Sequence, residues 1–216
     1  MSVNLFDENL AVEIAEHLVK IESIKINVAE PYTWASGWQS PIYCDNRLSL
    51  SYPEIRKLIT SSLVKIIKEK YPKVECIAGV ATAGIPQGAL VADALGVPFI
   101  YVRAKKKGHG MENLIEGVTH SEQKVVVIED LVSTGGSSIQ AAESLRHAGM
   151  EVLGMAAIFT YAFGISEDNF KAHHIDLWYL SDYPTLIESM LKKGDLQQDQ
   201  EATLQSWRSN PAQWNQ

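Results

Sequence analysis

The most constraining feature of the chain is the segment at residues 125–138, VVVIEDLVSTGGSS. Its first four residues are all β-branched, which is typical of a strand buried on both faces of a parallel sheet. Two acids, Glu129 and Asp130, follow where this strand is expected to leave the sheet. The Ser/Thr/Gly loop at 133–138 comes next, and from Ile139 apolar residues recur at helical spacing. The segment therefore predicts a buried strand, a loop of small residues and a helix in direct succession.

Strand and helix patterns alternate along the rest of the chain, which predicts an α/β fold with a parallel, doubly wound sheet. Strands are predicted over residues 76–81, 97–102, 125–128, 152–159 and 176–180. Helices are predicted over residues 9–21, from Pro53 onward, and over 85–95, 139–148 and 183–192. A chain of 216 residues is expected to form a single domain. The tail at 194–216 is rich in Gln and Asn, but Trp207 and Trp214 indicate that it packs.

The loop at 133–138 is suited to hold the phosphate of a sugar phosphate. In open α/β sheets, ligands bind in the crevice beyond the carboxyl ends of the strands. Hydroxyls, backbone amides and the start of a helix meet there, and a helix N-terminus favours an anion. Neither the P-loop pattern nor the dinucleotide fingerprint occurs in the chain. Two acids at a strand end would also suit a lone metal ion, and it is the order of strand, acidic pair and STGG that favours the sugar phosphate.

The basic segment at residues 103–110, RAKKKGHG, carries no acid in a chain whose formal net charge is -7. It follows a predicted strand and contains two glycines, which is typical of a loop. A solvated basic loop is one interpretation. The segment lies between two βα units whose strand ends are expected to share one crevice, and cationic charge gains strength as water leaves a closing site. This position favours binding of an anion such as pyrophosphate.

Two further segments carry weaker signals. The sequence GVATAGIP at 79–86 allows close approach of the backbone to a ligand, or close packing of a helix on a strand. The segment at 32–47 is dense in aromatic residues and turn formers, and a structural hairpin would explain it as well.

Composition narrows the class of protein. The acidic net charge of -7 argues against a broad nucleic-acid surface. No apolar run approaches the roughly 18 residues of a membrane span, and the first residues lack the order of a signal peptide, so a cytoplasmic location is expected. Cys44 and Cys76 are too few for a zinc site or a disulfide framework, and we expect them in packing positions.

The sequence IEDLVSTGG resembles the signature with which type I phosphoribosyltransferases bind 5-phosphoribosyl 1-diphosphate (PRPP). Most of residues 30–165 is similar to bacterial orotate phosphoribosyltransferases. The similarity is carried by SGWQSPIYCDNRLSLSYPEIR, AGVATAGIP, YVRAKKKGHGMENLIEG and VLGMAAIFTYAF. It implies a central parallel sheet flanked by helices, with a small N-terminal hood over the base at about residues 22–48.

The resemblance implies a PRPP site whose parts have separate tasks. Glu129 and Asp130 would hold the ribose 2- and 3-hydroxyls, and the loop would wrap the 5-phosphate. Lys107 and His109 match pyrophosphate-binding positions and are the catalytic candidates, with a general acid role toward the leaving group. Mg²⁺ would be held through PRPP rather than by a protein cage. The implied PRPP-binding residues are Arg103, Lys107, His109, Glu129, Asp130, Leu131, Val132, Ser133, Thr134, Gly135, Gly136 and Ser137.

The resemblance also implies an acceptor, orotate, and a partner, a second copy of the chain. Ser133, Tyr43 and Cys44 would lie against orotate, under the hood segment at 36–44. The loop bearing Lys107 and His109 usually closes over the neighbouring subunit's site in this family, which implies a functional homodimer. The implied reaction transfers the phosphoribosyl group to N1 of orotate and yields orotidine 5'-phosphate and diphosphate, a step in the synthesis of UMP.

Several positions depart from one branch of the family. That branch has lysines where Ala35, Ala83 and Ala104 align, and an arginine for the orotate carboxylate near Tyr161. The chain therefore belongs to another branch, or its substrate differs; Arg47 is a candidate carboxylate partner on charge alone. A phosphoribosyltransferase for another base, such as a purine, is one alternative. A non-enzymatic regulator that senses PRPP is the other, although it would be expected to carry a nucleic-acid-binding surface or an added domain.

Overall fold

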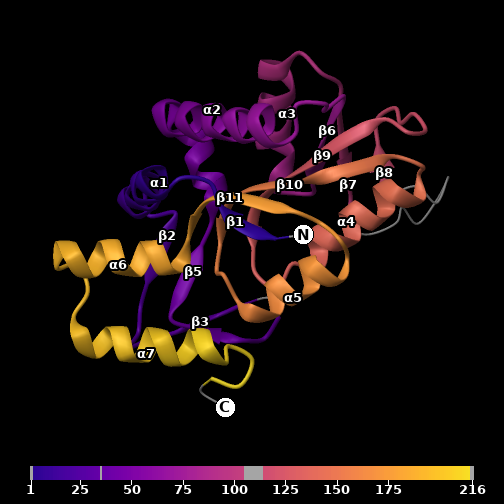
Figure 1. The fold of residues 1–216 in the computed structure, drawn as a ribbon. Helices are drawn as coiled ribbons and strands as arrows, with labels where there is room; N and C mark the ends of the chain where they lie inside the picture. The colour runs from indigo at the N-terminus through magenta and orange to yellow at the C-terminus, as the bar shows by residue number, and fades with distance from the viewer. Residues whose placement is uncertain (1, 35, 105–113, 215–216) are drawn as a thin grey trace.

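The computed structural model describes residues 2–34, 36–104 and 114–214. Its centre is a seven-stranded sheet in the order β1-β11-β10-β9-β6-β7-β8 (Figure 1). The strands span Val3–Leu5 (β1), Cys76–Val80 (β6), Phe99–Val102 (β7), Ile115–Glu116 (β8), Lys124–Val132 (β9), Glu151–Thr160 (β10) and Leu177–Asp182 (β11). Neighbouring strands are parallel, except that β8 runs antiparallel to β7. The predicted doubly wound, mostly parallel sheet is confirmed.

Helices cover both faces of this sheet, as Figure 1 shows. They span Glu8–Lys20 (α1), Pro53–Lys70 (α2), Gly84–Leu95 (α3), Gly136–His147 (α4), Gly164–Ala172 (α5), Tyr183–Lys193 (α6) and Gln198–Ser209 (α7). One core joins α1, α2, α3 and α6 to Val126 and Ile128, and a second core joins α4 and α5 to Val125 and Val127. The four β-branched residues thus point alternately into two cores, as expected of a strand buried on both faces.

The strand predicted over 125–128 continues to Val132, so the expectation that both acids stand beyond its end is wrong. Glu129 pairs in register with Ala157, and Val132 pairs with Thr160. The neighbouring strand β10 is long enough to offer partners to the whole segment, and this tertiary pairing extends the strand through two charged residues. The acidic pair therefore lies on a rigid strand, and the loop begins at Ser133.

Other boundaries differ for local reasons. Helix α4 begins at Gly136, three residues before the first apolar position that predicted it, because Gly135 adopts the left-handed φ of 82° that starts the helix. Strand β7 begins at Phe99 rather than Val97, because the Val97 N–H donates to Ala92 and closes the end of α3. Strands β1 and β8 and helix α5 were not predicted, because each is too short to show a clear period in the sequence.

The hood is two small antiparallel ladders nested in one another. The outer ladder pairs Ile24–Ile26 (β2) with Ile42–Cys44 (β5), and the inner ladder pairs Tyr32–Thr33 (β3) with Gln39–Ser40 (β4). A 3-10 helix over Asn46–Ser51 (η1) then leads into α2. The hairpin interpretation of this aromatic segment is therefore correct as a description of its shape.

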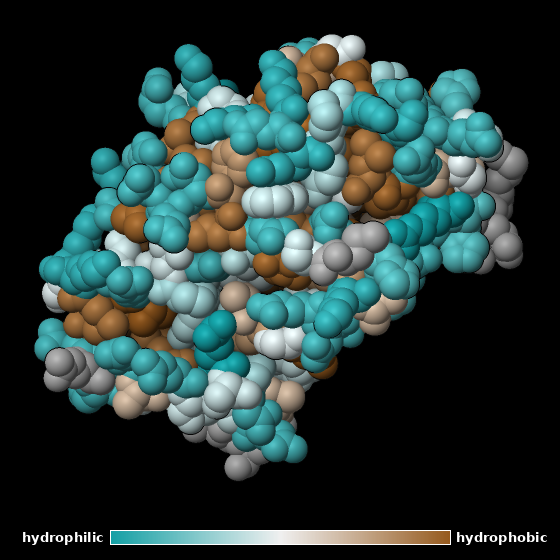
Figure 2. Space-filling view, viewed as in Figure 1, coloured by the Kyte–Doolittle hydropathy of each residue, from teal (hydrophilic) through white to brown (hydrophobic). Residues whose placement is uncertain are grey.

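The C-terminal tail contains helix α7, which was not predicted, and its Trp207 is fully buried. Figure 2 shows hydrophobic side chains on the floor of a hollow between α6 and α7. The expectation that the tail packs is confirmed. No helix in the described ranges is long and apolar enough to cross a membrane.

Candidate active site

Strands β9, β6 and β7 are neighbours, so their carboxyl ends meet at one edge of the sheet. Val80 pairs with Val102 at the ends of β6 and β7, and Gly79 pairs with Ile128 on β9. The acidic pair, the 79–86 segment and the start of the basic segment therefore share one crevice. This juxtaposition was expected from the alternation of strands and helices, and the sheet order confirms it.

Glu129 is buried toward helix α4, with 4% of its surface exposed. One carboxylate oxygen accepts the Ser138 hydroxyl at 2.9 Å, and the other accepts the Asp130 backbone N–H at 3.0 Å. Burial, reinforced by the negative charge of Asp130, raises the pKa of Glu129 well above its usual range. Glu129 thus joins the strand to the first turn of the helix and fixes the far end of the loop.

The Asp130 carboxyl shares a side-chain hydrogen bond with that of Glu129, and the residue lies beside the base of the hood. Its carbonyl oxygen accepts the side-chain amide of Asn46 at 2.7 Å. Burial raises the pKa of Asp130, and the positive charge of Arg47 opposes the rise. The charge of Asp130 in turn adds to burial in raising the pKa of the Cys44 thiol. Glu129 therefore contacts helix α4, whereas the backbone of Asp130 contacts the base of the hood.

The loop at 133–138 is shaped by one glycine. Gly135 has φ of 82°, and a Cβ built on it would lie 2.8 Å from the Phe170 ring of α5. The side-chain amide of Asn169 donates to the Thr134 carbonyl at 2.9 Å and ties the loop to α5. Helix α4 starts here with no side chain capping its first turn, among the residues described. Its first backbone amides therefore point toward the crevice, as an anion site requires.

The basic segment is described only at its start. The Arg103 guanidinium lies 3.5 Å from the Glu116 carboxylate of β8, and both side chains are about one-third exposed or less. Its backbone N–H donates to Leu114. This places Arg103 at the carboxyl end of β7, as predicted. Lys107 and His109 lie outside the described residues.

The 79–86 segment owes its glycines to packing. A Cβ on Gly79 would lie 2.8 Å from the carbonyl oxygen of Gly84, and one on Gly84 would lie 2.5 Å from that of Ile128. The start of α3 therefore presses against β6 and β9. Of the two interpretations of this segment, close packing of helix on strand accounts for these two residues.

The hood residues predicted to contact the base lie beside the acidic pair. Tyr43 is 41% exposed, and Cys44 is half-buried. The Cys44 thiol donates to the Asn46 side-chain oxygen at 3.4 Å. The pKa of Tyr161 is raised chiefly by burial, and the charges of Cys44, Tyr43 and Asp130 add to the rise, so these groups are gathered in one place.

Asn46 was missed as a site residue. It is 2% exposed, and it links the base of the hood to Asp130 by the hydrogen bond described above. The sequence around Asn46 indicates only a local turn, in which Asp45 accepts the Arg47 N–H as an Asx-type cap. The contact spans 84 positions of the chain, and no local pattern encodes it.

The two positions considered for the orotate carboxylate are both engaged elsewhere. Tyr161 is 2% exposed and packs with its ring centroid 5.0 Å from Trp34 and 5.5 Å from Phe163. The Arg47 guanidinium binds both oxygens of Asp45, at 2.7 and 2.8 Å. In this geometry the Arg47 guanidinium is paired with Asp45, and Tyr161 is packed in an aromatic cluster.

No group of three or more His, Cys, Asp and Glu side chains gathers as a metal cage within the described ranges. Magnesium commonly binds through one or two carboxylates and completes its shell with substrate phosphates and water. The acidic pair, next to the loop at 133–138, offers donors of that kind.

The chain is similar to known proteins in sequence and in fold. The sequence model described as "Phosphoribosyl transferase domain" matches residues 50–179. The chain is 56% identical over 206 residues to a Cytophaga hutchinsonii protein named orotate phosphoribosyltransferase, covering 95% of this chain and 99% of that protein. A Bacteroides thetaiotaomicron protein of the same name is 50% identical over 208 residues, covering 96% and 98%. The solved orotate phosphoribosyltransferase of Aeropyrum pernix superposes with a TM-score of 0.74 at 26% identity, covering 85% of this chain and 99% of that one.

Proposed function

This chain belongs to the phosphoribosyl transferase family, and we propose that within it the protein is an orotate phosphoribosyltransferase. In this reaction the phosphoribosyl group passes from PRPP to N1 of orotate, and orotidine 5'-phosphate and diphosphate are released on the way to UMP. One observation carries the proposal. The acidic pair, the phosphate-binding loop and the aromatic hood meet at one edge of the sheet, in a chain similar to orotate phosphoribosyltransferases along nearly its whole length.

The donor is held by β9 and the loop in this proposal. Loop hydroxyls and the first amides of α4 receive the 5-phosphate, since a helix N-terminus favours an anion. Glu129 and Asp130 receive the ribose hydroxyls. A carboxylate has about four lone-pair sites, so Glu129 accepts a ribose hydroxyl while it keeps Ser138. The rigid strand fixes the ribose with respect to the base.

The chemistry is mostly positional and electrostatic. The bond between ribose C1 and the pyrophosphate oxygen breaks, positive charge develops on the ribose, and orotate N1 attacks from the opposite face and gives up its proton to solvent. The negative charge of the leaving pyrophosphate is balanced by Arg103, Lys107 and His109. A proton from Lys107 or His109 assists the departure of the pyrophosphate. Mg²⁺, when bound through PRPP, neutralises part of that charge. Tyr43, Cys44 and Ser133 hold the orotate ring in line with C1.

The resemblance supports three further parts of the proposal. The whole chain acts as one domain, with the hood at about residues 22–48 and the tail at 194–216 as its additions. Two copies form a homodimer in which the basic segment of each closes over the other's site. The enzyme works in the cytoplasm, where Cys44 and Cys76 stay reduced; the structure describes both as free thiols.

Incubation of the protein with Mg²⁺, PRPP and one free base at a time tests the function. Loss of orotate absorbance together with formation of orotidine 5'-phosphate is the expected result. Turnover of a purine base without turnover of orotate would show a phosphoribosyltransferase of different specificity. Binding of PRPP without turnover of any base would instead identify a sensor.

A further inference from the structure

The hood and helix α7 meet although they come from opposite ends of the chain. The indole N–H of Trp207 donates to the backbone carbonyl of Gln39 on β4 at 3.2 Å, across 168 positions of sequence. Both segments lie outside residues 50–179, which match the family model. The acceptor side of the site therefore depends on a contact that the common domain does not contain.

Trp207 is also the centre of an aromatic cluster. It is fully buried, and the ring centroids of four other aromatic residues lie 5.5–5.7 Å from its own: Trp34, Tyr161, Phe163 and Tyr183. Trp34 belongs to the hood, and its indole N–H donates to Ile42 on β5 at 3.2 Å. Through Trp34, the cluster reaches the strand that carries Tyr43 and Cys44.

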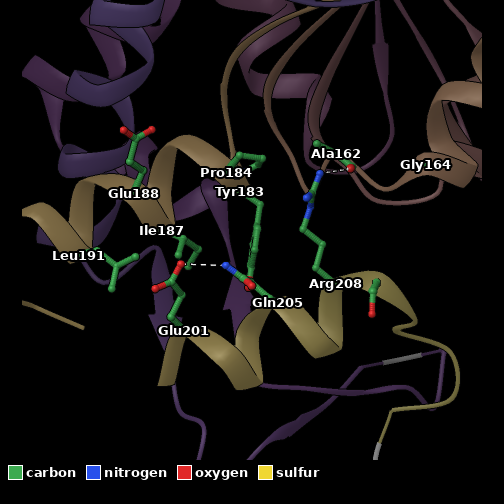
Figure 3. A pocket seen from close by; sticks show the side chains of 11 residues that line it. Ala162, Gly164, Tyr183, Pro184, Ile187, Glu188, Leu191, Glu201, Gln205 and Arg208 are labelled. Carbon is green, nitrogen blue, oxygen red and sulfur yellow. Dashed lines mark hydrogen bonds between the residues drawn. The ribbon is translucent and has the colours of Figure 1, made fainter. Parts of the chain in front are cut away.

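Arg208, which follows Trp207, fastens α7 to the sheet. Figure 3 shows Arg208 reaching from α7 to the turn between β10 and α5, where its guanidinium donates to the Ala162 carbonyl at 2.7 Å and to the Tyr161 carbonyl at 3.4 Å. The Tyr183 hydroxyl of α6 donates to Leu204 at 3.0 Å. A hollow of about 620 Å³ separates other parts of α6 and α7. The hold of α7 on the core is therefore concentrated around Leu204, Trp207 and Arg208.

The hood needs such support. Its ladders pair only three residues and two residues, and isolated hairpins of this size are at best marginally stable in water. A base-binding surface that is formed for only part of the time binds its ligand more weakly, in proportion to the fraction formed. The PRPP-binding loop is held by α4 and α5 instead, through Ser138 and Asn169, and neither of these two bonds involves a residue of α7.

We propose that α7 is a brace for the hood, with Trp207 and Arg208 as positioning residues that set the affinity for the acceptor base. The proposal rests on the proposed function for the identity of that base. The proposal predicts different effects on the affinities for the two substrates, because loss of the brace loosens the orotate site and leaves the PRPP site intact.

Two substitutions weaken the brace while keeping most of its packing. Trp207→Phe keeps a ring but removes the N–H bonded to Gln39, and Arg208→Met keeps the stem but removes both carbonyl contacts. We expect Trp207→Phe to raise KM for orotate about fivefold, the effect of one lost hydrogen bond, and Arg208→Met to raise it at least as much, because it loses two. We expect KM for PRPP, and kcat at saturating orotate, to change by less than about twofold.

Matched controls show whether the effect belongs to the brace. Trp178→Phe alters an indole on β11 that packs against Phe6 and Lys70. Arg146→Met alters an arginine that also donates to two carbonyls, those of His173 and His174. Both controls should leave KM for orotate unchanged.

Hydrogen exchange of the hood supplies a readout that needs no turnover. The backbone N–H groups of Trp34 and Gly37 donate within the hood, and we expect faster exchange of these amides in the two brace variants than in the controls. Unchanged exchange with unchanged KM for orotate, or an equal rise in both KM values, would overturn the brace. Absence of orotate turnover in the parent protein would refute the proposed function alone, and exchange would still decide the brace.

Discussion

Glu129 and Asp130 are adjacent acids in different surroundings. Glu129 is buried against Ser138, whereas Asp130 is half-buried beside the hood and bonded through its carbonyl to Asn46. The two carboxyls also contact each other through a side-chain hydrogen bond. Of the two, Asp130 is therefore the more accessible carboxylate for the ribose.

Asp130→Asn should weaken PRPP binding about tenfold. A hydrogen bond to a charged group contributes about 1.5–3 kcal/mol, and the amide keeps the shape of the side chain while losing the charge. Calorimetric titration with PRPP measures the effect. Asp93→Asn, at an exposed position of α3, is the control. Equal affinities for PRPP in the parent and Asp130→Asn would remove Asp130 from the ribose site.

Lys107→Ala should lower kcat about a hundredfold and change KM much less. A positioned proton donor or cation acts mainly on the leaving pyrophosphate in the transition state. Steady-state rates at varied PRPP concentrations give both constants. Because Lys107 lies outside the described residues, this prediction depends on the resemblance of the basic segment. An unchanged kcat would exclude Lys107 from the chemistry.

At the scale of elements, the loop and the hood are each held by a neighbour. The loop is tied to α5 through Asn169, and the base of the hood is tied to β9 through Asn46. Neither contact is local in sequence. Asp130 therefore links the strand that precedes the loop to the base of the hood.

Gly135→Ala should destabilise the protein by about 1–3 kcal/mol, because the substitution places a Cβ at positive φ and against Phe170. Gly136→Ala is the matched control, since the nearest atom to its added Cβ is 3.9 Å away. Urea unfolding measures both free energies. Equal stabilities for the two variants would show that Gly135 is not required for the conformation of the loop.

At the scale of the whole molecule, the buried pair links stability to pH. The folded pKa of Glu129 is raised well above its usual range, whereas the unfolded chain keeps the ordinary value of about 4.3. The stability due to this shift is fully present below about pH 4.3 and is lost as pH rises through the folded pKa.

Glu129→Gln removes this titration and keeps groups that can bond to Ser138 and the Asp130 N–H. We expect the variant to become more stable relative to the parent, in free energy of unfolding, as pH rises from about 5 to about 8. Urea unfolding at several pH values measures the gain. A constant difference across this range would mean that Glu129 does not titrate differently on folding.

The α/β class and the order of most strands and helices were predictable from the chain alone, and the donor site stays a prediction. These depend on local signals: β-branched runs, helical spacing, and an acidic pair followed by small residues in one continuous segment. Even there, the end of β9 was misjudged, because pairing with β10 overrides the low strand propensity of two acids.

The contacts that hold the hood in place could not be predicted from the chain alone. Asn46 reaches Asp130 across 84 positions, and Trp207 reaches Gln39 across 168. Such contacts leave no periodic pattern in the sequence. Their two partners are far apart in the chain and come together only when the protein folds. The tail is a further case: its composition is polar, yet one indole at the right place makes it part of the core.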